Sequence, residues 1–126
     1  AGTGNYVAYC WAEIAGFSKF GSYTGNGSTD GSFVYTGFRP KFIMIKRTDA
    51  VESWEIFDTS RSSYNTAVEL LEANSSGAES TSAGNAIDIL SNGFKQRNTR
   101  AATNASGGTY IYMAFAENPF KNALAR

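Results

Sequence analysis

Short apolar runs, separated by polar stretches rich in glycine and serine, recur along the whole chain. The strongest run is Phe42-Ile43-Met44-Ile45, which follows Pro40 and ends at two basic residues. A short apolar run bounded in this way predicts a strand covered on both faces, at the centre of a sheet. Pro40 is tolerated at its start because proline cannot donate a hydrogen bond to a neighbouring strand. We expect Ile43 and Ile45 at the centre of the core, with Phe42 and Met44 on the opposite, also buried face.

Alternation with a period of two predicts further strands. In chain order they span residues 6–14, 17–23, 32–38, 53–59, 87–90, 94–97 and 109–117. The first is apolar on both faces, so we expect cover on each side and a buried Cys10. The strand at 53–59 should pair with the one at 41–47 as an antiparallel hairpin. Asn92-Gly93 is a strong hairpin signal between the strands at 87–90 and 94–97. Four acidic residues surround the first hairpin and should form its solvent-exposed face: Asp49, Glu52, Glu55 and Asp58.

Other segments are less regular. Residues 66–73 fit either one or two helical turns capped by Asn65 or a strand. Small polar residues predict long loops at 24–32, 75–85 and 98–108, the last of them flexible. The end of the chain reads as a polar tail anchored by Phe120. Residues 6–13 and 110–117 are similar in sequence, which indicates either an internal repeat or two similar strands of one core.

These elements predict an all-β fold: a two-sheet antiparallel β-sandwich, jelly-roll-like, with about eight strands, long polar loops and at most one short helix. Its 126 residues suit a single domain over 1–126. Because the chain begins at Ala1 rather than methionine, we interpret it as a processed or excised part of a longer chain.

Charge and composition exclude several functions. Eleven basic and eleven acidic residues give no net charge, which argues against a nucleic-acid partner. The charges are segregated, at +3 for residues 1–47, −7 for 48–90 and +4 for 91–126. No apolar stretch is long enough to insert in a membrane. There is no histidine, so Ser-His-Asp and Cys-His catalysis is excluded, and one cysteine offers no metal centre. We expect no cofactor, no metal and no enzymatic activity.

Few residues suggest chemistry. The alternation Asn26, Ser28, Asp30 loosely resembles oxygen ligands for calcium, but turn chemistry explains it better. Glu13 and Glu117 end the two similar strands, where solvation explains them better than paired-carboxylate catalysis. Aromatic rings could offer flat faces to sugars, although most such rings fill cores. The candidate surface-recognition residues are Tyr23, Asn26, Asp30, Trp54 and Tyr64.

Three segments, GFSKFGSYTGNGSTDGSFVYTGFRPKFIMIKRTD (16–49), ILSNGFKQR (89–97) and NASGGTYIYMAFAENPF (104–120), together resemble a domain that recurs in tail-fibre-like and other virion structural proteins of tailed bacteriophages. The resemblance implies a location in the extracellular phage particle and a non-enzymatic structural role. That role would work through assembly, and through recognition of the host surface. Partners would then be identical subunits, other virion proteins or a host-surface glycan, with residues 1–14 or the tail 118–126 reaching into a neighbour. A carbohydrate-binding, lectin-like adhesion domain is the alternative.

Overall fold

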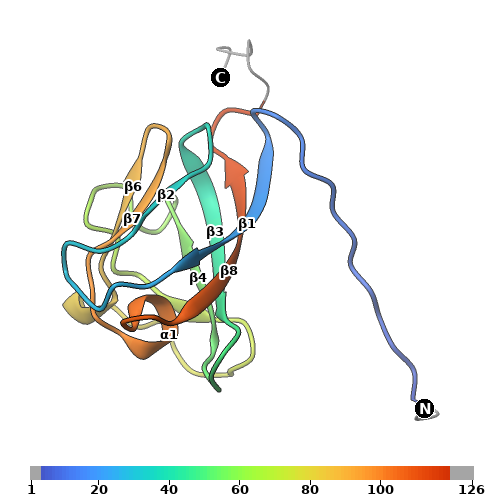
Figure 1. The fold of residues 1–126 in the computed structure, drawn as a ribbon. Helices are drawn as coiled ribbons and strands as arrows, with labels where there is room; N and C mark the ends of the chain where they lie inside the picture. Colours follow the sequence, from blue (N-terminus) through green and yellow to red (C-terminus); the bar gives the residue numbers. More distant parts are fainter. Residues whose placement is uncertain (1–3, 120–126) are drawn as a thin grey trace.

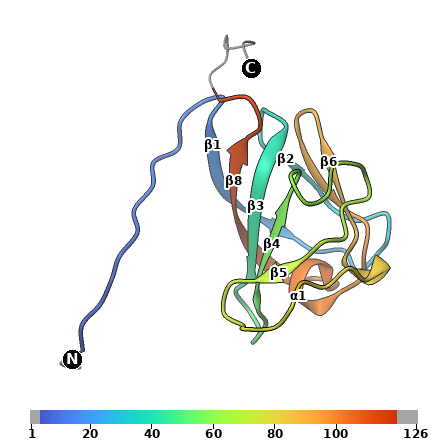
Figure 2. The ribbon, with the colours of Figure 1, turned by 180° about the vertical axis from the view of Figure 1, so that it is seen from behind.

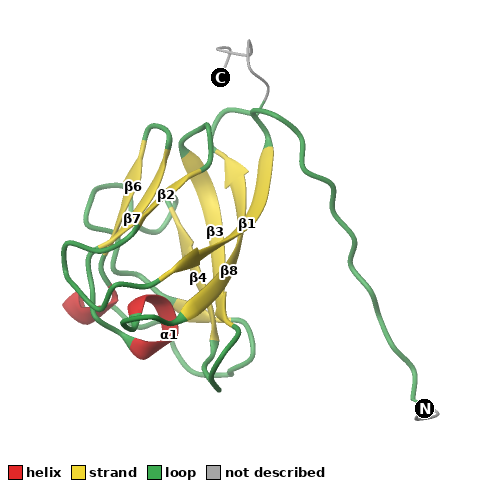
Figure 3. Ribbon diagram, in the orientation of Figure 1, coloured by secondary structure: helices red, strands yellow, loops and turns green. Residues whose placement is uncertain are grey.

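The computed structural model describes residues 4–119, which form two facing β-sheets (Figures 1 and 3). The five-stranded sheet has the order β1-β8-β3-β4-β5, and the three-stranded sheet the order β2-β7-β6. The elements are β1 (Ser18–Thr24), β2 (Phe33–Tyr35), β3 (Pro40–Arg47), β4 (Trp54–Asp58), β5 (Leu71–Glu72), a 3-10 turn η1 (Ala83–Asn85), β6 (Ile87–Leu90), β7 (Gly93–Gln96), α1 (Ala101–Asn104) and β8 (Thr109–Ala116). The predicted all-β sandwich is confirmed.

Both predicted hairpins are present. Strands β3 and β4 pair antiparallel with Ile43 opposite Phe57, and β6 pairs with β7 through the turn that contains Asn92. The core lies between the two sheets, where Ile43, Ile45 and Phe57 have no exposed surface. From the other sheet, Phe94 packs into the same cluster. Strand β3 is therefore central, as its apolar run predicts.

The opposite face of β3 differs from the prediction. Phe42 and Met44 are only half-buried, because within residues 4–119 neither the second sheet nor a helix covers that side. The apolar run identified a strand in the middle of its sheet. It did not show that one of its faces would be left partly open.

The last strand, β8, occupies an interior position, between β1 and β3 (Figure 2). It pairs antiparallel with both, so that Tyr110 lies opposite Tyr23 on one side and Arg47 on the other. The rings of Tyr110 and Tyr23 stack at 5.0 Å between centroids. The Tyr110 hydroxyl donates to the carbonyl of Ala101 at 2.7 Å and accepts from the amide of Ala105 at 2.7 Å. Strand β8 thus also holds α1 in place.

The predicted strand at residues 6–14 is wrong. Residues 4–13 are extended and exposed, and residues 4–10 run away from the two sheets (Figures 1 and 2). Pairing is limited to one bridge between Ile14 and Ser18, and Cys10 is exposed rather than buried. Alternation of side chains predicts the two faces of a strand, but it does not show which other strand it pairs with. Within residues 4–119, this segment has no neighbouring strand. The similar segment 110–117 is therefore not a structural repeat of it, because that segment forms β8 inside the sheet whereas residues 6–13 form no strand.

Residues 66–73 follow the strand alternative. Ala67 bridges to Ile87, and Leu71 and Glu72 form β5 at the sheet edge. Asn65 caps no helix. Its side chain instead donates to the carbonyl of Ile89 at 3.1 Å and accepts from the amide of Ile89 at 2.8 Å, which continues the edge of the smaller sheet.

The segment 98–108 is ordered by buried amides rather than flexible. Asn98 and Asn104 are both buried, and Asn104 Nδ2 donates to the carbonyls of Asn98 (2.7 Å) and Ser28 (2.8 Å). The loop 24–32 is fixed by the same residue, and a Cβ at Gly25 would collide with the backbone of Ala105. Phe120, the predicted anchor of the tail, lies outside the described residues.

Candidate functional site

An apolar surface covers the side of the five-stranded sheet that faces away from the smaller sheet. Strand register places alternate side chains of β1, β8, β3, β4 and β5 on it. We call this surface the outer face. Its apolar and small residues are Phe20, Ser22, Phe42, Met44, Trp54, Ile56, Leu71, Ile111, Met113 and Phe115. The register also places two charged residues on it, Lys46 between Trp54 and Ile111 and Asp58 beside Phe42. Ile111 and Trp54 are 43% and 40% exposed. Contiguous apolar surface of this kind marks interaction sites in soluble proteins.

One end of the outer face is a tight aromatic cluster. The ring of Phe115 lies 5.9 Å from that of Phe17, 6.0 Å from that of Phe20 and 6.2 Å from that of Phe42, measured between centroids. These edge-to-face and tilted contacts fix the rings against one another. The cluster gives this end of the face a rigid shape.

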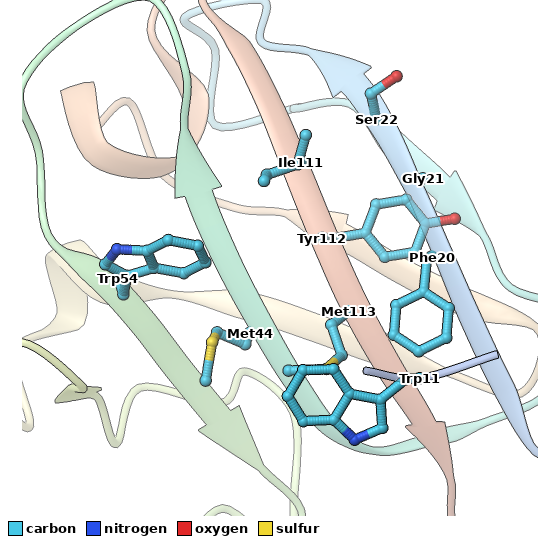
Figure 4. Close-up of a pocket in the computed structure, with 9 residues that line it drawn as sticks. All are labelled: Trp11, Phe20, Gly21, Ser22, Met44, Trp54, Ile111, Tyr112 and Met113. Atoms are coloured by element: carbon cyan, nitrogen blue, oxygen red, sulfur yellow. The ribbon is translucent and has the colours of Figure 1, made fainter. Parts of the chain in front are cut away.

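A groove of about 590 Å³ runs across the rest of the outer face (Figure 4). It is lined by residues from four strands and from the N-terminal segment: Trp11, Phe20, Gly21, Ser22, Met44, Trp54, Ile111, Tyr112 and Met113. No charged residue of the described chain lines it. Two tryptophans flank it, Trp54 from β4 and Trp11 from the N-terminal segment (Figure 4). Such a lining favours an apolar occupant over a charged substrate.

Of the five predicted recognition residues, Tyr23 belongs to the core. Its hydroxyl donates to the carbonyl of Thr103 at 2.7 Å and accepts from Gln96 Nε2 at 3.0 Å. Burial raises the pKa of Tyr23 well above its ordinary value. Its ring is therefore a structural link between β1 and the segment that contains α1, with no free face for a ligand.

Asn26 and Asp30 are brought together, since Asn26 Nδ2 donates to the carbonyl of Asp30 at 2.9 Å. The Asp30 carboxylate binds Lys95 at 2.6 Å, and this hydrogen bond lowers its pKa. Trp54 lies elsewhere, in the groove of the outer face. Tyr64 projects from the loop after β4 with 87% of its surface exposed. The five residues therefore do not form one site.

The oxygens of the 26–30 loop serve its own turns. Asn26 Oδ1 accepts from the amide of Ser28 at 3.0 Å, and Ser28 Oγ accepts from the amide of Asp30 at 3.1 Å. Across residues 4–119, no group of three or more acidic or cysteine side chains is placed to hold a metal ion. In the same residues no helix is long and apolar enough to cross a membrane.

The two strand-end glutamates are each paired with a cation. Glu13 lies 2.6 Å from Lys19 Nζ, and Glu117 lies 3.0 Å from the Nε of Arg39. Both carboxylates are partly exposed. These ion pairs are separate, one beside the start of β1 and one after the end of β8, and do not resemble an acid–base pair.

The acid that sequence reasoning placed wrongly is Glu55, which is fully buried instead of on the solvent-exposed face of the hairpin. Burial raises its pKa to about 7, against the attraction of Arg100 and with help from Glu72. The alternation in β4 carried the signal, because it puts Glu55 on the same side as Phe57. Since Glu55 has no exposed surface, it cannot reach a substrate.

The fold and its surfaces define a β-sandwich domain with one open apolar sheet face. The chain belongs to the family described as "Domain of unknown function (DUF7483)", which matches residues 1–119. No curated protein and no solved structure matches it.

Proposed function

We propose that this protein is a non-enzymatic structural module of a bacteriophage virion, in a tail fibre, an appendage or a capsid-associated protein, and that it works by assembly with other protein subunits. The observation that carries the proposal is the outer face, a mainly apolar surface whose groove is lined by no charged residue of the described chain. A surface of this kind is suited to burial against another protein. The resemblance of segments 16–49, 89–97 and 104–120 to phage virion domains supplies the location.

The polar groups support a structural role as well. Glu13, Glu117 and Asp30 are each bound to a basic side chain, and Glu55 is closed off from solvent. A general acid or base must come within hydrogen-bond distance of the atom on which it acts. None of these four carboxylates lies in the groove of the outer face.

The proposal is tested on purified phage particles. Mass spectrometry of particles banded in a density gradient should detect peptides of this chain at a constant ratio to the major structural proteins. Immunogold labelling of intact particles should place it on one structural component. Peptides found only in the soluble part of the lysate, and absent from particles, would contradict the proposal.

A carbohydrate-binding adhesion function is the second candidate, and a separate groove favours it. Tyr35 is 63% exposed and lines a groove of about 350 Å³ together with Glu13 and Lys19. An exposed ring beside charged hydrogen-bonding groups suits a sugar. Binding to a glycan array that is lost in Tyr35→Ala, and retained in Tyr64→Ala at another exposed tyrosine, would support it. An array with no binding above background would count against it.

A further inference from the structure

We propose that the N-terminal segment of one copy docks in the outer-face groove of a second copy of this chain, and that this exchange is how the module assembles. We call residues 4–13 the arm. The inference deepens the proposed assembly function and rests on it. It names the occupant of the groove and the surface that the arm covers.

The arm is an apolar element without cover from the rest of the described chain. Every one of its residues is exposed, including Tyr6 at 83% and Trp11 at 56%. Residues 4–12 carry no charge. The arm is already extended, so little further backbone ordering is needed for it to lie along a surface. Exposed apolar side chains on an extended segment are the features of a strand that is completed by a partner.

The groove matches the arm in chemistry and in length. Both are apolar, and neither the groove lining nor residues 4–12 contain a charged side chain. The groove crosses β1, β8, β3 and β4 (Figure 4), which span roughly 15 Å at the usual spacing between strands. Ten extended residues reach about 33 Å. The arm is therefore long enough to cross the groove and still connect to its own sheet.

The base of the arm is fixed, which directs the rest away from its own groove. Ser18 Oγ accepts from the amide of Ile14 at 3.1 Å and donates to the carbonyl of Ala12 at 2.9 Å, and Glu13 binds Lys19. A turn with Gly16 at φ 76° connects this base to β1, the edge strand. Beyond it, residues 4–10 leave the edge and run away from the body (Figures 1 and 2). No surface within residues 4–119 covers them, which leaves a neighbouring copy to supply one.

Trp11 connects the arm to the groove within one copy. It lines the groove of its own copy, as Phe20 and Ser22 do, while residues 4–10 continue past it. In the exchanged pair, each groove would have a wall from its own Trp11 and an occupant from the partner, which brings Tyr6, Val7 and Tyr9. Because each copy supplies both an arm and a groove, a two-fold dimer closes without unpaired surfaces.

The association is tested with two matched glutamate substitutions, each replacing an exposed aliphatic residue. Ile111→Glu puts a charge in the groove, and Val51→Glu puts the same charge in the β3–β4 turn, where Val51 is fully exposed. In sedimentation velocity we expect the native chain and Val51→Glu to dimerise equally. Ile111→Glu, and a deletion of residues 1–10, should weaken dimerisation at least tenfold. Circular dichroism should show that all four proteins keep their β-sheet fold.

The occupant is tested with the single cysteine, Cys10, which lies on the arm and is exposed. The native chain is mixed with a Cys10→Ser/Ser22→Cys variant, so that only a contact between two copies can link the arm to the groove. The control is Cys10→Ser/Ser91→Cys, with the new thiol in the exposed turn between β6 and β7. Mild oxidation should give a disulfide-linked heterodimer with the position 22 variant and little with the position 91 variant.

Several results would overturn the proposal. A chain that stays monomeric at high concentration has no exchanged arm. A dimer that survives Ile111→Glu does not use the groove. In Ser22→Cys with Cys10 retained, an oxidised monomer with an internal disulfide would mean that the arm covers its own groove. These results are independent of the particle experiment. A cross-linked dimer that is absent from virions would contradict the proposed function and support the interface. A monomer that is found in virions would support the proposed function and contradict the interface.

Discussion

Arg100 and Glu55 form an ion pair in the interior, with the guanidinium Nη2 2.7 Å from Glu55 Oε1. Arg100 Nη1 donates to Glu55 Oε2 at 3.1 Å and to Asn85 Oδ1 at 2.9 Å. The pair joins β4 to the segment before α1 and to the 3-10 turn. It links two segments outside the sheets to β4, and it makes their packing sensitive to the charge of a single carboxyl.

We predict that stability falls as the pH rises from about 4.5 to 7. Burial raises the pKa of Glu55 from its ordinary value of 4.5 to about 7. In this range the unfolded chain releases the proton that the folded chain retains, so unfolding becomes more favourable with rising pH. The loss from this group should reach up to about 3 kcal/mol, at 1.36 kcal/mol for each pKa unit. Urea titrations at a series of pH values measure it.

The matched control for the pH effect is Glu55→Gln, which keeps the shape of the side chain and removes its titration. The difference in unfolding free energy between this variant and the native chain should change with pH between 4.5 and 7 and be constant below pH 4. Parallel pH profiles for the two proteins would show that another group is responsible.

We expect Ile45→Ala to cost about 2–5 kcal/mol of stability, because it opens a cavity where Ile45 has no exposed surface. Val51→Ala, at a fully exposed position, should change the unfolding free energy by less than about 0.5 kcal/mol. Denaturant unfolding of both variants decides the matter. A loss below about 1 kcal/mol for Ile45→Ala would place β3 at the periphery.

Asn104→Ala should destabilise the protein by about 2–4 kcal/mol. The substitution leaves the amide of Asn26 and the carbonyls of Ser28 and Asn98 without their partner. The buried Asn98 carbonyl should account for about 1–3 kcal/mol, and the two partly buried groups of the 24–32 loop for less. Amide hydrogen exchange should increase in the 24–32 loop and little in β4. Asn118→Ala, at an exposed asparagine, serves as the control. Unchanged exchange in the loop would mean that its own turns suffice to hold it.

Removal of divalent metals should leave the melting temperature unchanged, since the oxygens of Asn26 and Ser28 already accept hydrogen bonds within the loop. Thermal unfolding with EDTA and with added calcium tests this. A melting temperature lowered by several degrees in EDTA would make the 26–30 loop a calcium site.

Local patterns in the sequence predicted most strands but few of their neighbours. The run 42–45 located β3 and its two core isoleucines, and Asn92 located the turn between β6 and β7. The pairing of β1 with β8 links residues about ninety positions apart in the chain, and nothing in either strand specifies it. For the same reason the alternating residues 6–14 suggested a paired strand where the described chain offers no neighbouring strand to pair with.

Polar residues were the other source of error. Glu55 was placed in solvent, and the segment that holds Asn98 and Asn104 was predicted to be a flexible loop, because such residues are usually exposed. All three residues are buried because each finds partners: Asn104 in the loop 24–32, and Glu55 in Arg100. Hydrogen-bond partners from distant segments cannot be identified from composition. The outer face was missed differently, since Phe42 and Met44 were assigned to a covered face and only Trp54 among its residues was predicted at the surface.

The interior position of β8 has a consequence for synthesis. A ribosome makes β1 and β3 long before it makes residues 109–116, which lie between them in the sheet. Until then both strands present unpaired edges, and edges of this kind recruit other chains. The sheet can close only after nearly the whole domain has left the exit tunnel. A nascent chain of this protein therefore depends on rapid completion, or on a chaperone, to avoid pairing with its neighbours on the same polysome.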